Sequence, residues 1–123
     1  MSNTFVWVDI PVVDLDRAIA FYSAVVGRPV SKVGDPTFSF GLFEHHGGEV
    51  GGCLGDSSGG PGPAMGGPLV YIDASDRLAA AVAAAERHGG QVLKPIHPIG
   101  PNGFRAIVAD TEGNRIALHS MAV

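Results

Sequence analysis

The sequence predicts an α+β fold built from two copies of a strand–helix–strand–strand–strand unit. In the first copy, an alternating stretch at residues 6–10 precedes a helical pattern that ends at Gly27. In the second copy, an alternating stretch at residues 69–72 precedes a helical pattern that ends at Gly89 and Gly90. Further strand-like stretches follow each helix, at residues 38–43 and 49–54 in the first copy and at residues 104–109 and 115–119 in the second. The recurrence of the same elements in the same order indicates a duplicated fold.

The length of 123 residues predicts one domain, residues 1–123, which removes roughly two thirds of its unfolded surface from water. We place module one at about residues 4–54 and module two at about residues 69–120. The intervening segment, residues 55–68, is rich in Gly, Pro and Ser and disfavours both helix and central strand. It also lacks the lysine and the glycine spacing of a phosphate-binding loop, so we expect a linker.

The first helix has a clear start, stripe and stop. Asp14 is expected to accept hydrogen bonds from the free N–H groups of the first turn, and Gly27 is expected to end the helix. Apolar residues recur between them at three- and four-residue spacing, at Ala18, Phe21, Tyr22 and Val25. This spacing predicts one buried face.

The second helix follows the same scheme with smaller side chains. Ser75 or Asp76 is expected to cap it, and the run of residues 79–85 is almost entirely alanine, which has a high helix propensity. The expected apolar stripe consists of Leu78, Val82 and Ala85. Such a helix can pack closely against its neighbours.

The strands separate an aliphatic face from a mixed face, because strand side chains alternate in direction. The aliphatic faces carry Val6, Val8 and Ile10 in the first strand and Ile116 and Leu118 in the last. The mixed faces carry Phe5, Trp7 and Asp9 in the first strand and Arg115, Ala117 and His119 in the last. We therefore expect the helices to cover the aliphatic face and a ligand site to lie on the mixed one.

Composition narrows the range of partners and compartments. The net charge is −4, the pI is about 5.6, and the eight Lys and Arg residues are scattered, so no nucleic-acid partner is expected. The chain shows neither a signal-peptide pattern nor an apolar run of membrane-spanning length, which predicts a cytoplasmic protein. Cys53 is the only cysteine, so no internal disulfide is expected.

Two strings carry a family resemblance: VVDLDRAIAFYSAVVGRPV at residues 12–30 and DTEGNRIALHS at residues 110–120. Together with the two-copy pattern, they resemble the superfamily of glyoxalases, bleomycin-resistance proteins and extradiol dioxygenases. The resemblance implies two βαβββ modules that form a curled mixed sheet around a cavity, with the helices on the outer face. It also implies a homodimer.

Metal-dependent members of that superfamily hold a divalent ion with four side chains from the concave strands. By the resemblance, these positions fall on Trp7, Val70 and Ala117, with the fourth near Gly51 or Gly52. None of these side chains offers a ligand atom to a cation. We therefore predict no metal and no other cofactor, and an unusual site formed by Glu49 and a histidine is the remaining alternative.

The histidines are expected in unremarkable positions, with one exception. His45 and His46 are expected in a solvated turn, His88 at the end of the second helix, and His97 in a loop. His119 shares a strand face with Ala117 and is therefore a candidate to border the cavity.

The candidate ligand-binding residues are Trp7, Asp9, Arg105, His119 and Phe5. A carboxylate on a partly buried strand needs a partner. Asp9 is thus expected either in a structural ion pair with Arg105 or Arg115, or as an acceptor for a ligand that an arginine also holds. Trp7 and Phe5 provide either a flat wall for a ligand or packing in the core or a dimer interface. No catalytic residue is assigned.

Three function classes fit these features. We predict a metal-independent binder of a small molecule, aromatic or acidic in character. The first alternative is an enzyme of lyase, isomerase or dioxygenase type, with a non-standard metal site or with acid–base chemistry through Asp9 and His119. The second is a purely structural or partner-binding dimer whose concave face is filled by side chains.

Overall fold

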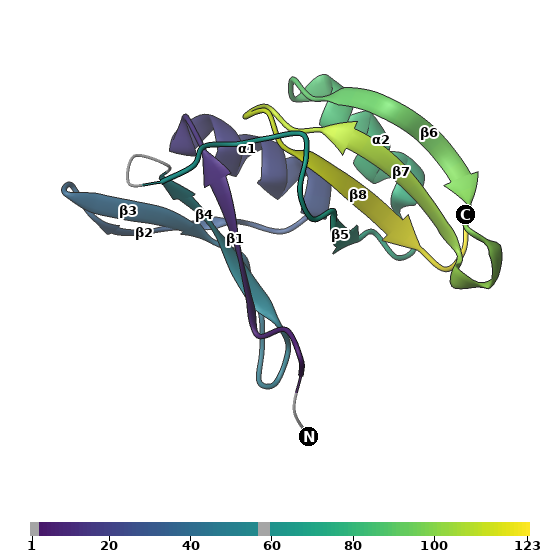
Figure 1. Ribbon diagram of the computed structural model, residues 1–123, viewed down its shortest axis with the longest axis horizontal. Coiled ribbons are helices and arrows are strands. Elements are labelled where there is room, and N and C mark those ends of the chain that lie inside the picture. Colours follow the sequence, from purple (N-terminus) through teal and green to yellow (C-terminus); the bar gives the residue numbers. More distant parts are fainter. Residues whose placement is uncertain (1–2, 57–59) are drawn as a thin grey trace.

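The computed structural model describes residues 3–56 and 60–123, which form two four-stranded sheets and two α-helices (Figure 1). The first sheet has the order β1-β4-β3-β2 and the second has the order β5-β8-β7-β6. The elements of module one are β1 (Trp7–Val12), α1 (Leu15–Val26), β2 (Ser31–Asp35), β3 (Phe38–Leu42) and β4 (Gly51–Asp56). The elements of module two are β5 (Val70–Asp73), α2 (Leu78–Arg87), β6 (Gln91–Pro98), a 3-10 turn (Gly100–Asn102), β7 (Phe104–Ala109) and β8 (Arg115–Ser120).

Each module has the predicted βαβββ order, which confirms the α+β fold class. In both sheets the first strand pairs in parallel with the last, β1 with β4 and β5 with β8, and the other pairs are antiparallel. The described strands form two separate sheets that lie side by side, and they do not close into a single barrel (Figure 1).

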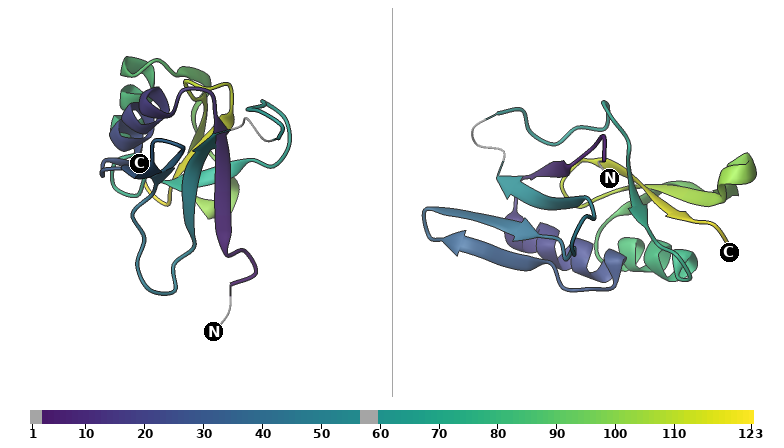
Figure 2. Two further views of the ribbon diagram at one scale, coloured as in Figure 1. Left: turned by 90° about the vertical axis from the view of Figure 1, so that its left-hand side faces the viewer. Right: turned by 90° about the horizontal axis from the view of Figure 1, so that it is seen from below.

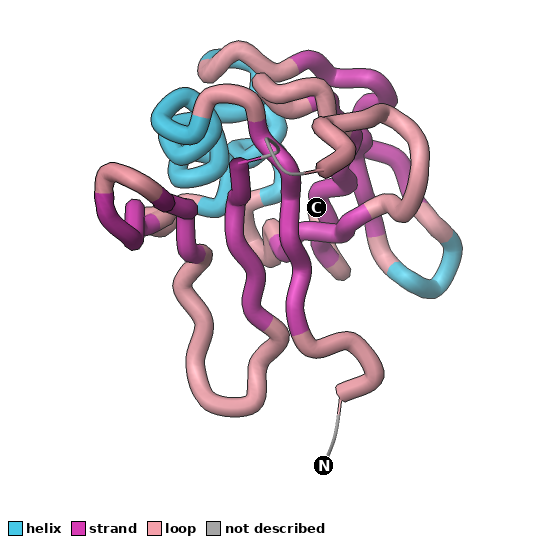
Figure 3. The backbone as a smooth tube through the Cα atoms, turned by 60° about the vertical axis from the view of Figure 1, so that its left-hand side comes forward, coloured by secondary structure: helices cyan, strands magenta, loops and turns pink. Residues whose placement is uncertain are grey.

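The helices and the inter-module segment lie on opposite sides of the sheets. Both helices cover one side, as the aliphatic strand faces predicted, and residues 60–68 cross the other side (Figure 2). We call this second side the open face. The strands β1 and β4 run beside each other in the first sheet (Figure 3). The loop between β3 and β4 approaches the N-terminal segment, and Asn3 Nδ2 donates to the Gly48 carbonyl over 2.8 Å.

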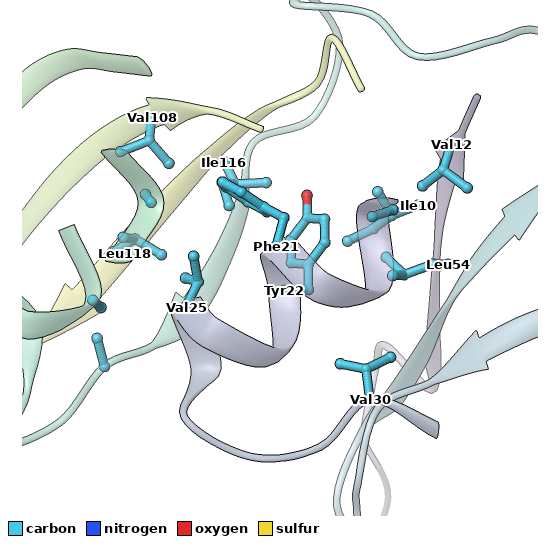
Figure 4. Packing of buried hydrophobic residues seen from close by; sticks show 14 of the residues in the cluster. Ile10, Val12, Phe21, Tyr22, Val25, Val30, Leu54, Val108, Ile116 and Leu118 are labelled. Atoms are coloured by element: carbon cyan, nitrogen blue, oxygen red, sulfur yellow. The ribbon is translucent and has the colours of Figure 1, made fainter. Parts of the chain in front are cut away.

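Helix α1 forms as predicted and provides the centre of the core. Asp14 Oδ1 accepts from the Arg17 N–H, and Gly27 ends the helix at a φ of 74°, a left-handed value that suits glycine. The four predicted stripe residues are the buried residues of this helix. They pack with residues of both sheets, including Ile10, Leu54, Ile116 and Leu118 (Figure 4).

Helix α2 differs from its prediction at the start and along the stripe. The N-cap residue is Arg77, which makes no side-chain cap bond, and Ser75 instead donates to Asp73. The prediction that Ser75 or Asp76 caps this helix was therefore wrong. Leu78 and Ala85 are buried as expected, but Val82 is only partly buried. Ala81 and Ala84 are buried in its place, because the alanine-rich face of α2 lies close to α1.

A loop of module two, residues 110–114, fastens the two modules together, and we call it the junction loop. Glu112 Oε1 accepts from the backbone N–H groups of Val13 and Asp14, and Glu112 also pairs with Arg17 over 2.8 Å. Asp110 accepts from the hydroxyl of Tyr22 over 2.5 Å. The two strings that carry the family resemblance therefore contact each other, and they do so as structural elements.

Burial of the Glu112 carboxyl raises its pKa, but the hydrogen bonds that it accepts outweigh this effect. Arg17, the backbone N–H groups of Asp14 and Val13, and the Thr111 hydroxyl together lower the pKa of Glu112 from 4.5 to about 2. Burial, followed by the neighbouring Asp110, raises the pKa of Tyr22 well above its usual range. Both groups therefore keep their bonding charge states at neutral pH.

Two strands were not located from the sequence, and both are edge strands. β2 is exposed along its whole length, and β6 contains two prolines and two register irregularities, so neither shows regular alternation. His97 was expected in a loop but lies in β6. The expected linker is also shorter, since Gly55 and Asp56 belong to β4. Residues 60–68 form neither helix nor strand, and residues 57–59 lie outside the described residues.

Candidate functional site

The open face of the first sheet brings together a tryptophan, a carboxylate and the single thiol. Trp7 pairs with Gly51 across the β1–β4 ladder, and Asp9 pairs with Cys53. Paired residues of neighbouring strands point to the same side of a sheet. The Trp7 Nε1–H donates to Asp9 Oδ1 over 2.9 Å, and the Cys53 Sγ–H donates to the same oxygen over 3.1 Å.

These contacts make the Cys53 thiol a hydrogen-bond donor to Asp9. Burial raises the pKa of the Cys53 thiol, and the hydrogen bond to Asp9 raises it further. The thiol therefore stays protonated at neutral pH, where it acts as a donor to Asp9 and not as a nucleophile.

His45 belongs to this cluster, although the sequence suggested only a solvated turn. Its ring packs edge-on against Trp7, with 5.5 Å between the ring centroids. Gly51 makes room for this contact, because a Cβ atom at that position would lie 2.9 Å from both rings. His46 and Glu49 do behave as turn residues, since the Glu49 carboxylate accepts from the His46 N–H over 2.8 Å.

The first groove, of about 740 Å³, lies on the open face beside this cluster. Aromatic and other apolar residues dominate its wall, with Asp9 and Asp56 as its acidic members. Its lining consists of Trp7, Asp9, Ile10, Pro11, Phe38, Phe40, Cys53, Gly55, Asp56, Gly60, Pro61 and Gly62. Phe38 and Phe40 are neighbours on β3, with 5.9 Å between their ring centroids.

The second groove, of about 510 Å³, continues on the other side of β1. It lies between β1, the inter-module segment and the start of β8, and it shares Trp7 and Asp9 with the first groove. Phe5 and Arg115 are among its other lining residues. Phe5 itself precedes β1 and is 77% exposed.

Arg105 and His119 lie on the second sheet, away from Trp7 and Asp9. Arg105 Nε donates to His97 Nε2 over 3.0 Å, and the same guanidinium donates to the Tyr71 hydroxyl and lies over the Tyr71 ring. His119 contacts the Asn102 carbonyl over 2.7 Å and packs against Tyr71.

The candidate site therefore divides into two sets. The structure brings Trp7 and Asp9 together and places Phe5 along the second groove, but Arg105 and His119 form a separate cluster with Tyr71 and His97. The ion pair that we expected between Asp9 and Arg105 or Arg115 is not among the ion pairs of the described residues. Instead, Asp9 Oδ1 accepts from Trp7 and Cys53, and the Arg105 guanidinium bonds to Tyr71 and His97.

One of the positions compared with the family's metal ligands needs correction. Val70 pairs with Ile116, whose face is committed to the core, whereas Tyr71 pairs with Ala117 on the open face. The open-face position of β5 is thus Tyr71, and the register of β4 selects Gly51 for the fourth position. Within residues 3–56 and 60–123, no three His, Cys, Asp or Glu side chains converge in a group that could hold a metal ion.

No helix among the described residues is long and apolar enough to cross a membrane.

Comparison with known proteins identifies the family. The sequence model of the glyoxalase/bleomycin resistance protein/dioxygenase superfamily matches residues 4–118. The chain belongs to this superfamily. No curated protein sequence matches it significantly, so membership alone does not assign a reaction within the superfamily.

Solved structures of superfamily members share the fold at low sequence identity. A glyoxalase/bleomycin resistance protein from Albidiferax ferrireducens has a TM-score of 0.74 at 22% identity, over 96% of this chain and 98% of that one. A glyoxalase-related enzyme from Fulvimarina pelagi has a TM-score of 0.72 at 16% identity, over 96% of this chain and 88% of that one. A glyoxalase I mutant from Zea mays has a TM-score of 0.69 at 21% identity, over 94% of this chain and 45% of that one.

Proposed function

We propose that this superfamily member is a metal-independent binder of a small planar, aromatic molecule. The observation that carries the proposal is the first groove, whose apolar wall includes Trp7, Phe38 and Phe40 beside a carboxylate. Its volume of about 740 Å³ suits a small-molecule site, and such sites combine apolar walls with a few polar groups that fix orientation.

Asp9 is the polar group that fixes orientation in this proposal. Within the described chain, both donors to its carboxylate reach Oδ1, so Oδ2 remains to accept a hydrogen bond from the ligand. The Trp7 and Cys53 donors hold the carboxylate in place before a ligand arrives, which reduces the entropy lost on binding. We therefore propose a ligand that carries an O–H or N–H donor.

The side chains at the family's metal positions favour binding over metal-assisted catalysis in this proposal. The four family positions carry Trp7, Gly51, Tyr71 and Ala117, none of which is a normal ligand of a divalent ion. Acid–base chemistry through Asp9 and His119 also lacks support, because the two side chains make separate contacts on separate sheets.

Binding is tested with 2-naphthol, a planar compound with one O–H donor. We expect saturable quenching of the protein's only tryptophan, and we expect Trp7→Ala to weaken binding, measured by calorimetry, by about 1–3 kcal/mol. Leu93→Ala is the matched control, because Leu93 is exposed to a similar degree on the other sheet and should leave the affinity unchanged. Equal affinity of all three proteins would contradict the proposed site.

The metal-independence has its own measurement. Elemental analysis of dialysed protein should find far less than one equivalent of Zn, Ni, Mn or Fe per chain, and a chelator should leave 2-naphthol binding unchanged. One equivalent of any of these metals, or binding that a chelator abolishes and one metal restores, would contradict it.

We also propose a homodimer, since several apolar side chains on and beside β1 are exposed. Phe5, Val6 and Trp7 are 77%, 73% and 43% exposed, and β1 is an edge strand of its sheet. Pairing with a second copy covers such an edge and buries apolar area. Light scattering should give about twice the chain mass of 12.6 kDa, and a monomer at tens of micromolar would refute the dimer.

A further inference from the structure

Arg115 carries a polar group that the fold leaves unsatisfied. Its Nε is buried and has no hydrogen-bond partner, the one such side-chain atom found among the described residues. A buried donor without a partner costs free energy, and native proteins satisfy most of these groups. An exception at the edge of a groove therefore points to a partner that the chain itself does not provide.

Arg115 also lines the second groove, so its guanidinium lies beside a space that a ligand can occupy. Arg115 begins β8, pairs with Ala109, and lines the second groove together with Trp7 and Asp9. Its side chain shares the open face with Ala117 and His119, since strand side chains alternate. The same groove thus offers an acceptor at Asp9 and a cationic donor at Arg115.

Asn114 holds the walls of this groove in place. Its Nδ2 donates to the Pro11 carbonyl over 2.8 Å and to Asp110 over 3.0 Å, and its Oδ1 accepts from the Ala64 N–H over 3.3 Å. One side chain therefore connects β1, the inter-module segment and the start of β8. Arg115 is the next residue in the chain, so its backbone is fixed relative to both groove walls.

Arg105 provides the contrast on the same sheet. Its guanidinium bonds to His97 and Tyr71, both within the chain. The bonds of Arg105 within the chain therefore explain its presence, whereas the Arg115 Nε has no such bond.

We propose that Arg115 anchors the carboxylate of the bound ligand. The ligand class is a planar aromatic carboxylic acid that also carries a hydrogen-bond donor. The ring lies against Trp7 and the donor reaches Asp9, two residues that both grooves share, and the carboxylate pairs with the guanidinium in the second groove. A planar guanidinium matches a carboxylate with two parallel hydrogen bonds, which a lysine does not reproduce. This inference rests on the proposed function and specifies its ligand.

The test compares 2-naphthol with 4-hydroxy-2-naphthoate and 6-hydroxy-2-naphthoate, which add a carboxylate at two separations from the hydroxyl. We expect at least one hydroxynaphthoate to bind tenfold or more tightly than 2-naphthol. Arg115→Met should remove that advantage and leave the affinity for 2-naphthol unchanged, and Arg115→Lys should restore only part of it. Arg105→Met, which removes the same charge from the same sheet, should preserve the advantage.

The outcomes separate this inference from the proposed function. If 2-naphthol binds at Trp7 but the carboxylate adds nothing, or if its advantage survives in Arg115→Met, the anchor is wrong and the proposed function stands. If none of the three compounds binds, both are wrong.

The free protein gives a second measurement: Arg115→Met should leave the melting temperature unchanged or raised, whereas Arg105→Met should lower it. A clear loss of stability in Arg115→Met would show a structural role and overturn the anchor.

Discussion

The junction loop and the open face around β1 both contain polar side chains, but they use them in opposite ways. In the junction loop, Asp110, Glu112 and Asn114 are buried, and each is hydrogen-bonded to another segment of the chain. On the open face, Trp7 and Asp9 are exposed, and the Arg115 Nε is buried without a partner.

This difference separates residues that hold the fold from residues available to a ligand. Bonds that are complete within the chain stabilise the native state and leave nothing for a partner to satisfy. Unsatisfied and exposed groups beside a groove add little to the stability of the native state but can bond to a ligand. Substitutions of such groups therefore change stability little. Substitutions at Asp110 and Glu112 should therefore lower stability without changing binding, and substitutions on the open face should change binding without lowering stability.

The largest expected effect is on stability, in Glu112→Gln. The neutral amide loses the charged pair with Arg17 and presents one acceptor oxygen where the carboxylate has two, so we expect a loss of about 3 kcal/mol at pH 7. Chemical denaturation measures this loss. The affinity of Glu112→Gln for 2-naphthol should be unchanged. Equal stability of the two proteins would show that the junction loop does not fasten the modules.

The same substitution should also remove a pH dependence. The folded pKa of Glu112 lies below its unfolded value, so its contribution is complete above about pH 4.5 and is lost as the pH falls toward about 2. The stability of the wild-type protein should therefore fall toward that of Glu112→Gln across this range. Parallel stability curves for the two proteins from pH 5 to pH 2 would contradict the assigned pKa.

Tyr22→Phe should have the next largest effect. The Tyr22 hydroxyl is fully buried and donates to the Asp110 carboxylate, and hydrogen bonds to charged groups contribute about 1.5–3 kcal/mol. Asp110 keeps its bonds from the N–H groups of residues 112–114, so we expect a loss near 2 kcal/mol and no unfolding. Denaturant titration measures it, and a gain in stability would show that the buried hydroxyl is a liability.

Gly51→Ala and Gly90→Ala compare the open face with the packed core next to the junction loop. A Cβ at Gly90 would lie 2.7 Å from the Ala109 carbonyl oxygen and from the Phe21 ring, so backbone must move, and overpacking of this kind costs about 1–3 kcal/mol. A Cβ at Gly51 would instead meet the rings of Trp7, which is exposed, and His45, which is half-buried. We expect Gly51→Ala to lose less than about 1 kcal/mol but to shift the tryptophan emission, and an unshifted spectrum would contradict the packing of Trp7 over Gly51.

The smallest effect concerns the reactivity of Cys53. Burial and the bond to Asp9 raise the pKa of the thiol, so Asp9→Asn should lower it and increase the rate of iodoacetamide labelling at pH 8 by roughly two- to fivefold. Stability should change little. The rate in Asp56→Asn, a carboxylate of the same groove, provides the comparison, and equal rates in both variants would mean that Asp9 does not control the thiol.

The sequence predicted those parts of the fold that depend on local patterns. The cap at Asp14, the stripe of α1 and the stop at Gly27 each depend on residues close in the chain, and each is confirmed. The edge strands β2 and β6 lack a regular buried face, so no periodic signal marked them. The cap of α2 was missed because Ser75 bonds to Asp73 and not to the helix.

The candidate site was predicted only in part, because its contacts cross between strands. Alternation placed Trp7 and Asp9 on one face of β1, but it contains no information on which residues lie opposite them. Cys53 and His45 join the cluster through the register of β4 and through the loop before it. Long-range register also explains why Arg105 was grouped with Asp9 although it bonds to His97 and Tyr71.

The junction loop has a consequence for the order in which the chain folds during synthesis. Helix α1 is among the first segments made, yet the N–H groups of Val13 and Asp14 at its start bond to Glu112, nearly one hundred residues later. The Tyr22 hydroxyl likewise has no bond to Asp110 until that residue has been synthesised. Module one therefore leaves the ribosome without the bonds to Glu112, and its native structure is complete only when almost the whole chain has been translated. Such dependence on distant contacts slows folding and lengthens the exposure of apolar surface.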